Sequence, residues 1–206
     1  MVALLLVLAT VPQTVSAPPP GEVLNIRVYA DRHVNKAIVR DATEVAERLL
    51  AAAGVATRWR LCPIARACPT DADVREPVVV IFSSEPRARN NGHCGYATRR
   101  DAAIATGTVV ISVPCVAELT ARIVSRSAKP FPMIGRYDDV VGAIAAHEIG
   151  HLLGLSHAVS GLMRPRLEDA DIFALRLGRL CFTEVQTAQM RAAISRAMAT
   201  PASPRP

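Results

Sequence analysis

The segment His147–His157 reads HEIGHLLGLSH, and its spacing constrains how the chain around it folds. His147 and His151 are four positions apart, so on a helix both imidazoles project from the same face, about one turn apart. Two nitrogens at this spacing can bind one ion, and Glu148 can reach a water on that ion without binding it. The segment therefore predicts a helix that carries part of a metal site and a general base.

A third ligand must follow the helix, because a catalytic zinc site uses three protein ligands and keeps a fourth position open. His157 can supply this ligand if the helix ends before it and the chain turns back. Gly154 suits that end, since glycine readily adopts the left-handed conformation that terminates helices. Met163 lies in the turn-like stretch Gly161–Pro165, where it can form an apolar floor beneath the imidazoles.

From His147 to Met163 the sequence resembles the metzincin zinc peptidases, and among them most closely the matrixin branch. Some metzincins place a tyrosine two residues after the Met-turn methionine, but Pro165 occupies that position, so no tyrosine ligand is implied. The resemblance implies one catalytic zinc ion, three histidine ligands, a glutamate base and a Met-turn, carried by His147, His151, His157, Glu148 and Met163.

The remaining sequence predicts an α+β domain. Period-two alternation and short apolar runs predict strands at 22–30, 55–61, 78–83 and 107–113. The run 78–83 is apolar almost throughout, which predicts a strand buried on both faces. Helical spacing and end signals predict helices at 34–53, from Asp138 or Asp139 through the histidine segment, and from Thr183 to about Met198. Residues 117–126 are either a short helix or irregular, and 166–181 show no clear periodicity.

The resemblance adds an arrangement to these elements. It implies a mostly parallel, twisted sheet with one antiparallel edge strand, a long zinc-binding active-site helix and a C-terminal helix. The edge strand would be Gly95–Thr98, whose unpaired backbone groups would hold an extended peptide beside the zinc; the alternative is an ordinary surface turn. The implied substrate-binding residues are Gly95, Tyr96, Ala97, Thr98 and Leu162, with Ile172, Phe173, Leu175 and Leu177 as further candidates to line a side-chain pocket.

Five cysteines suit disulfide formation in an oxidising compartment, with one left over. Cys62 and Cys68 can pair locally within a proline-containing loop. In the arrangement that the metzincin resemblance implies, the start of the edge strand lies beside the end of the 107–113 strand. The resemblance therefore predicts a disulfide between Cys94 and Cys115.

The N-terminus has an apolar run, Val2–Leu8, followed by small residues that end at Ala17, which is typical of a secretory signal peptide. We therefore expect a signal peptide at 1–17, a metzincin-like catalytic domain at 18–199 and a disordered tail at 200–206. No other apolar run approaches the roughly 20 residues that a spanning helix needs, so we expect no integral membrane segment in the mature chain. We also expect the protein to be secreted, extracellular or periplasmic, and monomeric.

Composition argues against a nucleic-acid partner. The net charge of +6 comes from arginine, since Lys36 and Lys129 are the only lysines, and aromatic residues make up 4% of the chain. Single-strand binding surfaces combine basic stripes with stacking aromatics, and the sequence has no such stripe. We expect a peptide or protein substrate instead.

These observations predict a zinc-dependent endopeptidase in which Glu148 acts as the base toward a zinc-bound water. Two alternatives stay open. One is a secreted, non-catalytic zinc- or protein-binding module of the same fold, and the other is a zinc hydrolase that cleaves a non-peptide amide.

Overall fold

A five-stranded sheet forms the base of the domain. The computed structural model describes residues 23–64, 68, 78–86, 93–100, 106–126 and 136–199, and the expected signal peptide and tail lie outside these ranges. The strands have the order β2-β1-β3-β5-β4, in which β4 is antiparallel to β5 and the other pairs are parallel. Their bounds are β1 (Val23–Ala30), β2 (Ala56–Leu61), β3 (Val78–Ser83), β4 (Gly95–Arg99) and β5 (Gly107–Ser112). This topology confirms the predicted mostly parallel sheet with one antiparallel edge strand.

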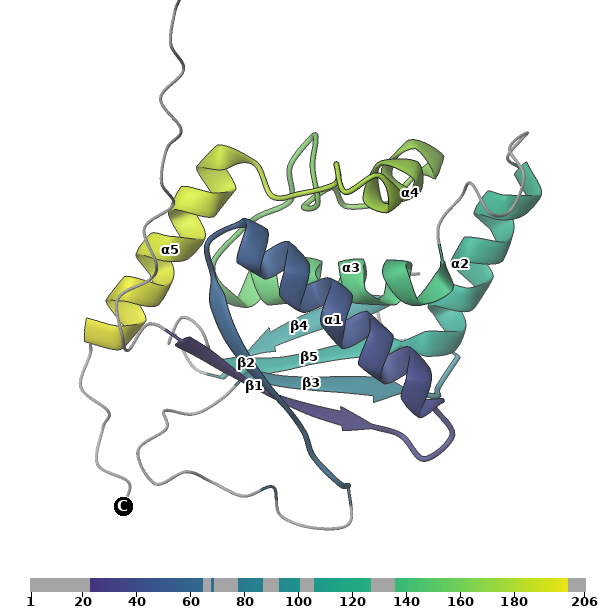
Figure 1. The fold of residues 1–206 in the computed structure, drawn as a ribbon, viewed down its shortest axis with the longest axis horizontal. Coiled ribbons are helices and arrows are strands. Elements are labelled where there is room, and N and C mark those ends of the chain that lie inside the picture. The colour runs from purple at the N-terminus through teal and green to yellow at the C-terminus, as the bar shows by residue number, and fades with distance from the viewer. Residues whose placement is uncertain are drawn as a thin grey trace, which may run out of the picture.

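Five helices complete the described fold: α1 (Lys36–Ala52), α2 (Val113–Arg126), α3 (Tyr137–Leu152), α4 (Asp169–Arg176) and α5 (Glu184–Ala199). In Figure 1, α1 and α3 lie together beside the sheet, with α2 at one end of the molecule and α5 at the other. The segment that contains α4 lies on the side of α3 away from the sheet (Figure 1). The histidine-bearing helix α3 is therefore enclosed between the sheet and the C-terminal segment.

The helices cover one face of the sheet. Residues in register on neighbouring strands share a face, and the buried ones form rows across it, with Val28 beside Val80 and Val109, and Phe82 beside Ile111. Gly95 is the β4 partner of Ile111, and a Cβ on Gly95 would lie 2.9 Å from Cγ2 of Ile144 on α3. The buried face is thus the one that faces α3.

The prediction that 78–83 is buried on both faces is wrong for the second face. Burial in β3 alternates, so that Val78, Val80 and Phe82 are buried while Val79 and Ile81 are only partly covered. The apolar run contributes side chains to two faces of the sheet. Those on the face that the helices cover are buried, and those on the other face are only partly covered in the described structure. A continuous apolar run alone does not report how many faces are covered.

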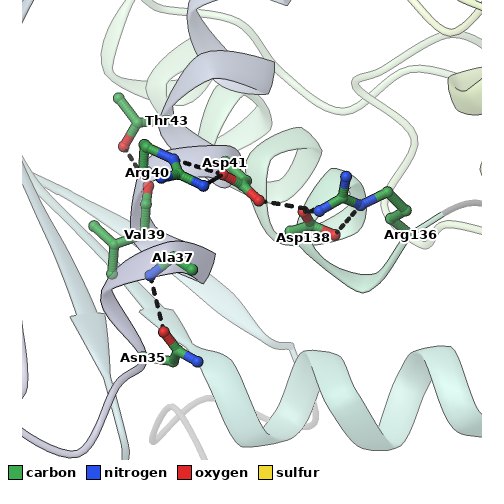
Figure 2. Close-up of polar contacts among 8 residues, drawn as sticks. All are labelled: Asn35, Ala37, Val39, Arg40, Asp41, Thr43, Arg136 and Asp138. Carbon is green, nitrogen blue, oxygen red and sulfur yellow. Dashed lines mark hydrogen bonds and ion pairs between the residues drawn. The ribbon is translucent and has the colours of Figure 1, made fainter.

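Helices α1 and α3 approach each other closely at Gly142. A Cβ on this glycine would lie 2.5 Å from the backbone oxygen of Ala42 and 2.6 Å from Cβ of Val45. The contact continues at the start of α3, where the Arg136 guanidinium pairs with Asp41 of α1 at 3.0 Å and with Asp138 at 2.7 Å (Figure 2). Small residues and opposite charges together fix the position of α3 on α1.

Two helix assignments differ from the sequence prediction. Helix α2 starts at Val113 rather than within 117–126, because Pro114 lies in its first turn, where a missing N–H is tolerated. Helix α4 lies in the segment without clear periodicity. It is short, and its first turn is held by Glu168, whose backbone N–H bonds Asp171, and by an ion pair between Arg164 and Asp171 at 3.0 Å.

The cysteines pair as two disulfides. Cys94 joins Cys115 with a Cα–Cα distance of 5.3 Å, which confirms the predicted bond between the start of β4 and α2. Cys62 joins Cys68, also at 5.3 Å, and Cys181 is free and exposed. No helix within the described ranges combines the length and apolar character that crossing a membrane requires.

Candidate metal centre

Three imidazoles converge at the C-terminal end of α3. Nε2 of His151 lies 3.1 Å from Nε2 of His147 and 3.2 Å from Nε2 of His157. Their ligand atoms all lie within 4.8 Å of one another, and among the described residues this is the one group of three or more side chains that could hold a metal ion. The structure thus brings together the three histidines that the sequence singled out.

The orientation of two of these rings is fixed by backbone carbonyls. Nδ1 of His147 lies 2.8 Å from the carbonyl oxygen of Leu162, and Nδ1 of His151 lies 2.8 Å from that of Leu155. A carbonyl oxygen only accepts, so each Nδ1 carries the proton and donates it. Each neutral ring then presents the lone pair of Nε2 to the common centre, which is the form that binds metal.

The donor set fits a single zinc ion. Zinc binds histidine nitrogen at about 2.0–2.1 Å, and a tetrahedral arrangement at that distance separates neighbouring nitrogens by about 3.3–3.4 Å. The two separations from Nε2 of His151, 3.1 Å to His147 and 3.2 Å to His157, are close to this value. The Nε2 atoms of His147 and His151 point lone pair toward lone pair at 3.1 Å, and a cation bound to both turns this repulsion into attraction.

A tight turn after α3 brings His157 back to the centre. Gly154 has φ of 92°, in the region that favours glycine, and its N–H donates to the carbonyl of His151. The N–H of Leu155 donates to the carbonyl of Gly150, which completes the end of the helix. The conformation expected for Gly154 is confirmed, and with it the reversal of the chain.

Met163 packs directly under the helix between the first two histidines. Its side chain is fully buried, and a Cβ placed on Gly150 would lie 2.8 Å from its Sδ. The backbone also ties this turn to the third histidine, since the N–H of Ala158 donates to the carbonyl of Met163. Gly150 therefore lets the turn that carries Met163, and the orienting carbonyl of Leu162, approach α3.

Glu148 is 7% exposed and lies beneath the edge strand. A Cβ on Gly95 would be 2.9 Å from Cγ of Glu148 and 3.0 Å from its Oε1. Burial raises the pKa of Glu148 from 4.5 to about 7, because a carboxylate loses solvation in this position. A carboxyl group with this pKa can both accept and return a proton near neutral pH.

Burial has the opposite effect on the histidines. It lowers the pKa of His147 to about 4, with smaller contributions from the neighbouring imidazoles and an opposing one from the hydrogen bond to Leu162. The pKa of His151 is also lowered, chiefly by burial. Desolvation disfavours the charged imidazolium, so these rings stay neutral at physiological pH and remain able to bind a cation.

The edge strand has a defined set of outward-facing backbone groups. The N–H of Ser112 donates to the carbonyl of Cys94, so these residues form a hydrogen-bonded pair of the antiparallel ladder. Pairs alternate along such a ladder, which directs the backbone groups of Tyr96 and Thr98 toward β5. The N–H and C=O groups of Gly95, Ala97 and Arg99 face the other edge, which no described strand pairs with.

The candidate pocket residues differ in how far their side chains are buried. Leu162, Ile172 and Leu175 are buried in the core, whereas Phe173 is partly buried and Leu177 is 47% exposed. Their role in binding a substrate side chain stays a prediction.

Three features of the site were not predicted from the sequence. Arg99 donates from Nη2 to the carbonyl of His151 at 3.0 Å and so fastens the end of β4 to the end of α3. The carbonyls of Leu155 and Leu162 orient the imidazoles and leave no signature in residue type. Gly150 did leave a signal, because a glycine inside a helix is unfavourable unless a neighbour needs the space.

No protein-family model and no curated protein sequence matches the chain. Among solved structures, it is similar to an archaemetzincin from Methanopyrus kandleri, with a TM-score of 0.51 and 18% identity over 86% of this chain and 99% of that one. It is also similar to a zinc-dependent peptidase from Methanocorpusculum labreanum, with a TM-score of 0.51 and 17% identity over 80% of this chain and 99% of that one. Metalloproteinase-II from Bacteroides fragilis gives a TM-score of 0.51 and 10% identity over 87% of this chain and 55% of that one. The protein thus shares its fold with zinc metallopeptidases.

Proposed function

We propose that this protein is a zinc-dependent endopeptidase of the metzincin type. The observation that carries the proposal is the convergence of the three Nε2 atoms, at 3.1 and 3.2 Å, beside a buried glutamate on the same helix. The fold shared with an archaemetzincin and other zinc peptidases supports it independently of this motif. The finer, matrixin-like placement rests on the segment from His147 to Met163 alone.

In this proposal His147, His151 and His157 hold the ion, and Met163 supports them from below. A bound zinc ion supplies Lewis acidity, which polarises a carbonyl oxygen and lowers the pKa of a water ligand to about 7. Glu148 takes a proton from the attacking water and returns it to the leaving amine, since a carboxylate accepts a proton and the resulting carboxyl group donates it. Its burial beside the edge strand limits competing solvent.

The outward edge of β4 holds the substrate in the proposed complex. A peptide in extended conformation adds to a free sheet edge through main-chain hydrogen bonds, which are independent of its side chains. Gly95, Ala97 and Arg99 present these groups, and Gly95 lies against Glu148. A peptide bond docked here would lie beside the metal centre, which favours a peptide over a non-peptide amide.

We also propose that the protein is secreted. Two disulfides support an oxidising compartment, where such bonds persist. The signal-like segment before Ala17 provides the route.

Cleavage of casein by the purified protein tests the proposed activity. We expect fragments to appear with the zinc-loaded protein, to disappear after treatment with a chelator, and to return when zinc is restored. A folded, zinc-loaded protein that leaves casein intact would favour the non-catalytic module. A mixture-based peptide library distinguishes the remaining alternative, because a hydrolase of non-peptide amides would cleave none of its members.

A further inference from the structure

Gly95 is the point at which the edge strand β4 rests on α3. A Cβ there would lie 2.9 Å from Cγ of Glu148, 2.9 Å from Cγ2 of Ile144 and 3.0 Å from Oε1 of Glu148. Carbon atoms in favourable contact are about 3.5–4.0 Å apart, so the space beside Gly95 does not admit a methyl group. The residue does not have a positive φ, so the missing side chain, rather than an unusual backbone, is what the site requires.

We propose that Gly95 is a positioning residue for Glu148. Its bare Cα forms the surface against which the Glu148 side chain is held, while its outward N–H and C=O face the docked substrate. The strand that would bind the peptide is therefore also the strand that sets the position of the base. This inference rests on the proposed peptidase function and adds the requirement for glycine at position 95.

The strand has little freedom to retreat from an added methyl group. Its ladder with β5 includes Gly95 itself, and the preceding residue, Cys94, is joined to Cys115. At its far end Arg99 donates to the carbonyl of His151. One attachment to β5, one to α2 and one to α3 thus hold β4 in place on both sides of Gly95.

Helix α3 has equally little freedom, since Ala143, Ala145 and Ile149 are fully buried around the contact. The Glu148 side chain is the group that can move, because it reaches its position through rotatable bonds. We therefore expect an alanine at position 95 to leave the fold intact and to displace the carboxylate. Misplacement of a reacting group by about 1 Å can lower the rate about 10²-fold.

The test is the Gly95→Ala variant of the full chain, loaded with zinc and assayed beside the wild type. We expect kcat to fall about 100-fold with KM changed less than about 3-fold, because the outward backbone groups remain. Zinc content should equal that of the wild type. The double variant Gly95→Ala with Glu148→Gln should have the same kcat as Glu148→Gln alone, because both changes disable the same group.

A crystal structure of Gly95→Ala supplies a readout that does not depend on activity. It should show the Glu148 carboxylate displaced while β4 and the three histidines keep their positions. Val39→Ala, a truncation of a buried residue in α1, serves as the control for general loss of stability and should leave kcat near the wild-type value.

The wild type and the variant test the proposed function and the role of Gly95 separately. A wild-type protein without peptidase activity would overturn the proposed function, whereas an active wild type with an unaffected Gly95→Ala variant would overturn only the role of Gly95. If Gly95→Ala does not fold, Gly95→Ala with Ile144→Ala is compared with Ile144→Ala alone, since this change removes one of the two contacts. The expected result is again a large fall in kcat. Equal rates, or failure of the double variant to fold, would contradict the inference.

Discussion

Two polar clusters lie at opposite ends of α3 and differ in the kinds of groups that they bring together. At the N-terminal end, the Arg136 cluster (Asp41, Arg136 and Asp138) pairs a guanidinium with two carboxylates at 3.0 and 2.7 Å (Figure 2). At the C-terminal end, the histidine cluster (His147, His151 and His157) brings like groups within 3.1 and 3.2 Å of one another. The first cluster pairs opposite charges within the chain, whereas the second brings together three groups that could hold a cation.

The difference separates a structural cluster from the candidate functional one. The Arg136 cluster joins α1 to α3 on the protein surface, where hydrogen bonding to Arg40 lowers the pKa of Asp41 and solvent screens the charges. The histidine cluster is partly buried, and burial lowers the pKa of His147 and of His151, which disfavours their charged forms. Strongly shifted pKa values that accompany converging ligands indicate a functional site.

The largest expected effect comes from removing Glu148, the proposed base, at the histidine end. Glu148→Gln keeps the size of the side chain but cannot accept a proton, so we expect kcat to fall by about 10²–10⁴-fold. Zinc content, measured by atomic absorption, should stay at the wild-type level because Glu148 is not a ligand. A variant with near wild-type kcat would remove Glu148 from the mechanism.

The same substitution should stabilise the metal-free protein, with a dependence on pH. The pKa of Glu148 is raised from 4.5 to about 7, so the folded state disfavours its charged form. This penalty is absent below pH 4.5, grows as pH rises from 4.5 to 7, and reaches about 3 kcal/mol above that range, at about 1.4 kcal/mol for each pKa unit.

Urea unfolding of the metal-free proteins at pH 4.5 and pH 8 measures this effect. The stability of Glu148→Gln relative to the wild type should increase by about 3 kcal/mol between the two pH values. A relative stability that is the same at both would show that the carboxyl group is not desolvated in the folded protein.

A smaller effect is expected at the floor of the histidine cluster. In Gly150→Ala the new Cβ would lie 2.8 Å from Sδ of Met163 and 3.1 Å from Cε1 of Phe182. Overpacking of this kind costs about 1–3 kcal/mol, and the higher helix propensity of alanine offsets about 1 kcal/mol of it. We expect a net loss of about 1 kcal/mol, seen as a fall of about 2–4 °C in the midpoint of thermal unfolding.

The double variant Gly150→Ala with Met163→Ala tests whether the loss of stability comes from the contact between the new methyl group and the Met163 side chain. Because the sulfur that the new methyl group meets is then absent, the two changes should not be additive. Additive losses of stability would show that Gly150 and Met163 act independently.

The smallest effect is expected at the Arg136 cluster. Exposed ion pairs contribute little to stability, so Arg136→Ala should lower the midpoint of thermal unfolding only slightly and leave kcat and zinc content unchanged. Raising the salt concentration should reduce the difference further, because surface charges are screened. A marked loss of activity in Arg136→Ala would mean that the start of α3 is coupled to the histidine cluster.

The parts of the fold that follow from local pattern were predicted from the sequence. The helix through His147 and His151, the turn at Gly154 and the capping of α5 by Thr183 and Gln186 depend on residues close together in the chain. The bounds of β3 match the predicted 78–83, since an apolar run between prolines identifies a buried strand. Interactions between residues close together in the chain are therefore sufficient to predict these elements.

Other features depend on contacts between distant segments and could not be predicted in this way. Helix α4 is too short to show a periodicity and is held by Arg164. The space that Gly95 leaves for Glu148, and the carbonyl that Leu162 offers to His147, arise only when α3 meets β4 and the turn after His157. The sequence predicted the candidate ligands and the candidate base, whereas the groups that orient them required the three-dimensional structure.

Anomalous diffraction at the zinc absorption edge, from crystals of the full chain grown with zinc, tests most directly whether the three imidazoles bind one ion. We expect a single peak about 2.0–2.1 Å from Nε2 of His147, His151 and His157. Zinc bound elsewhere on the chain, or zinc bound by fewer than these three nitrogens, would contradict the account.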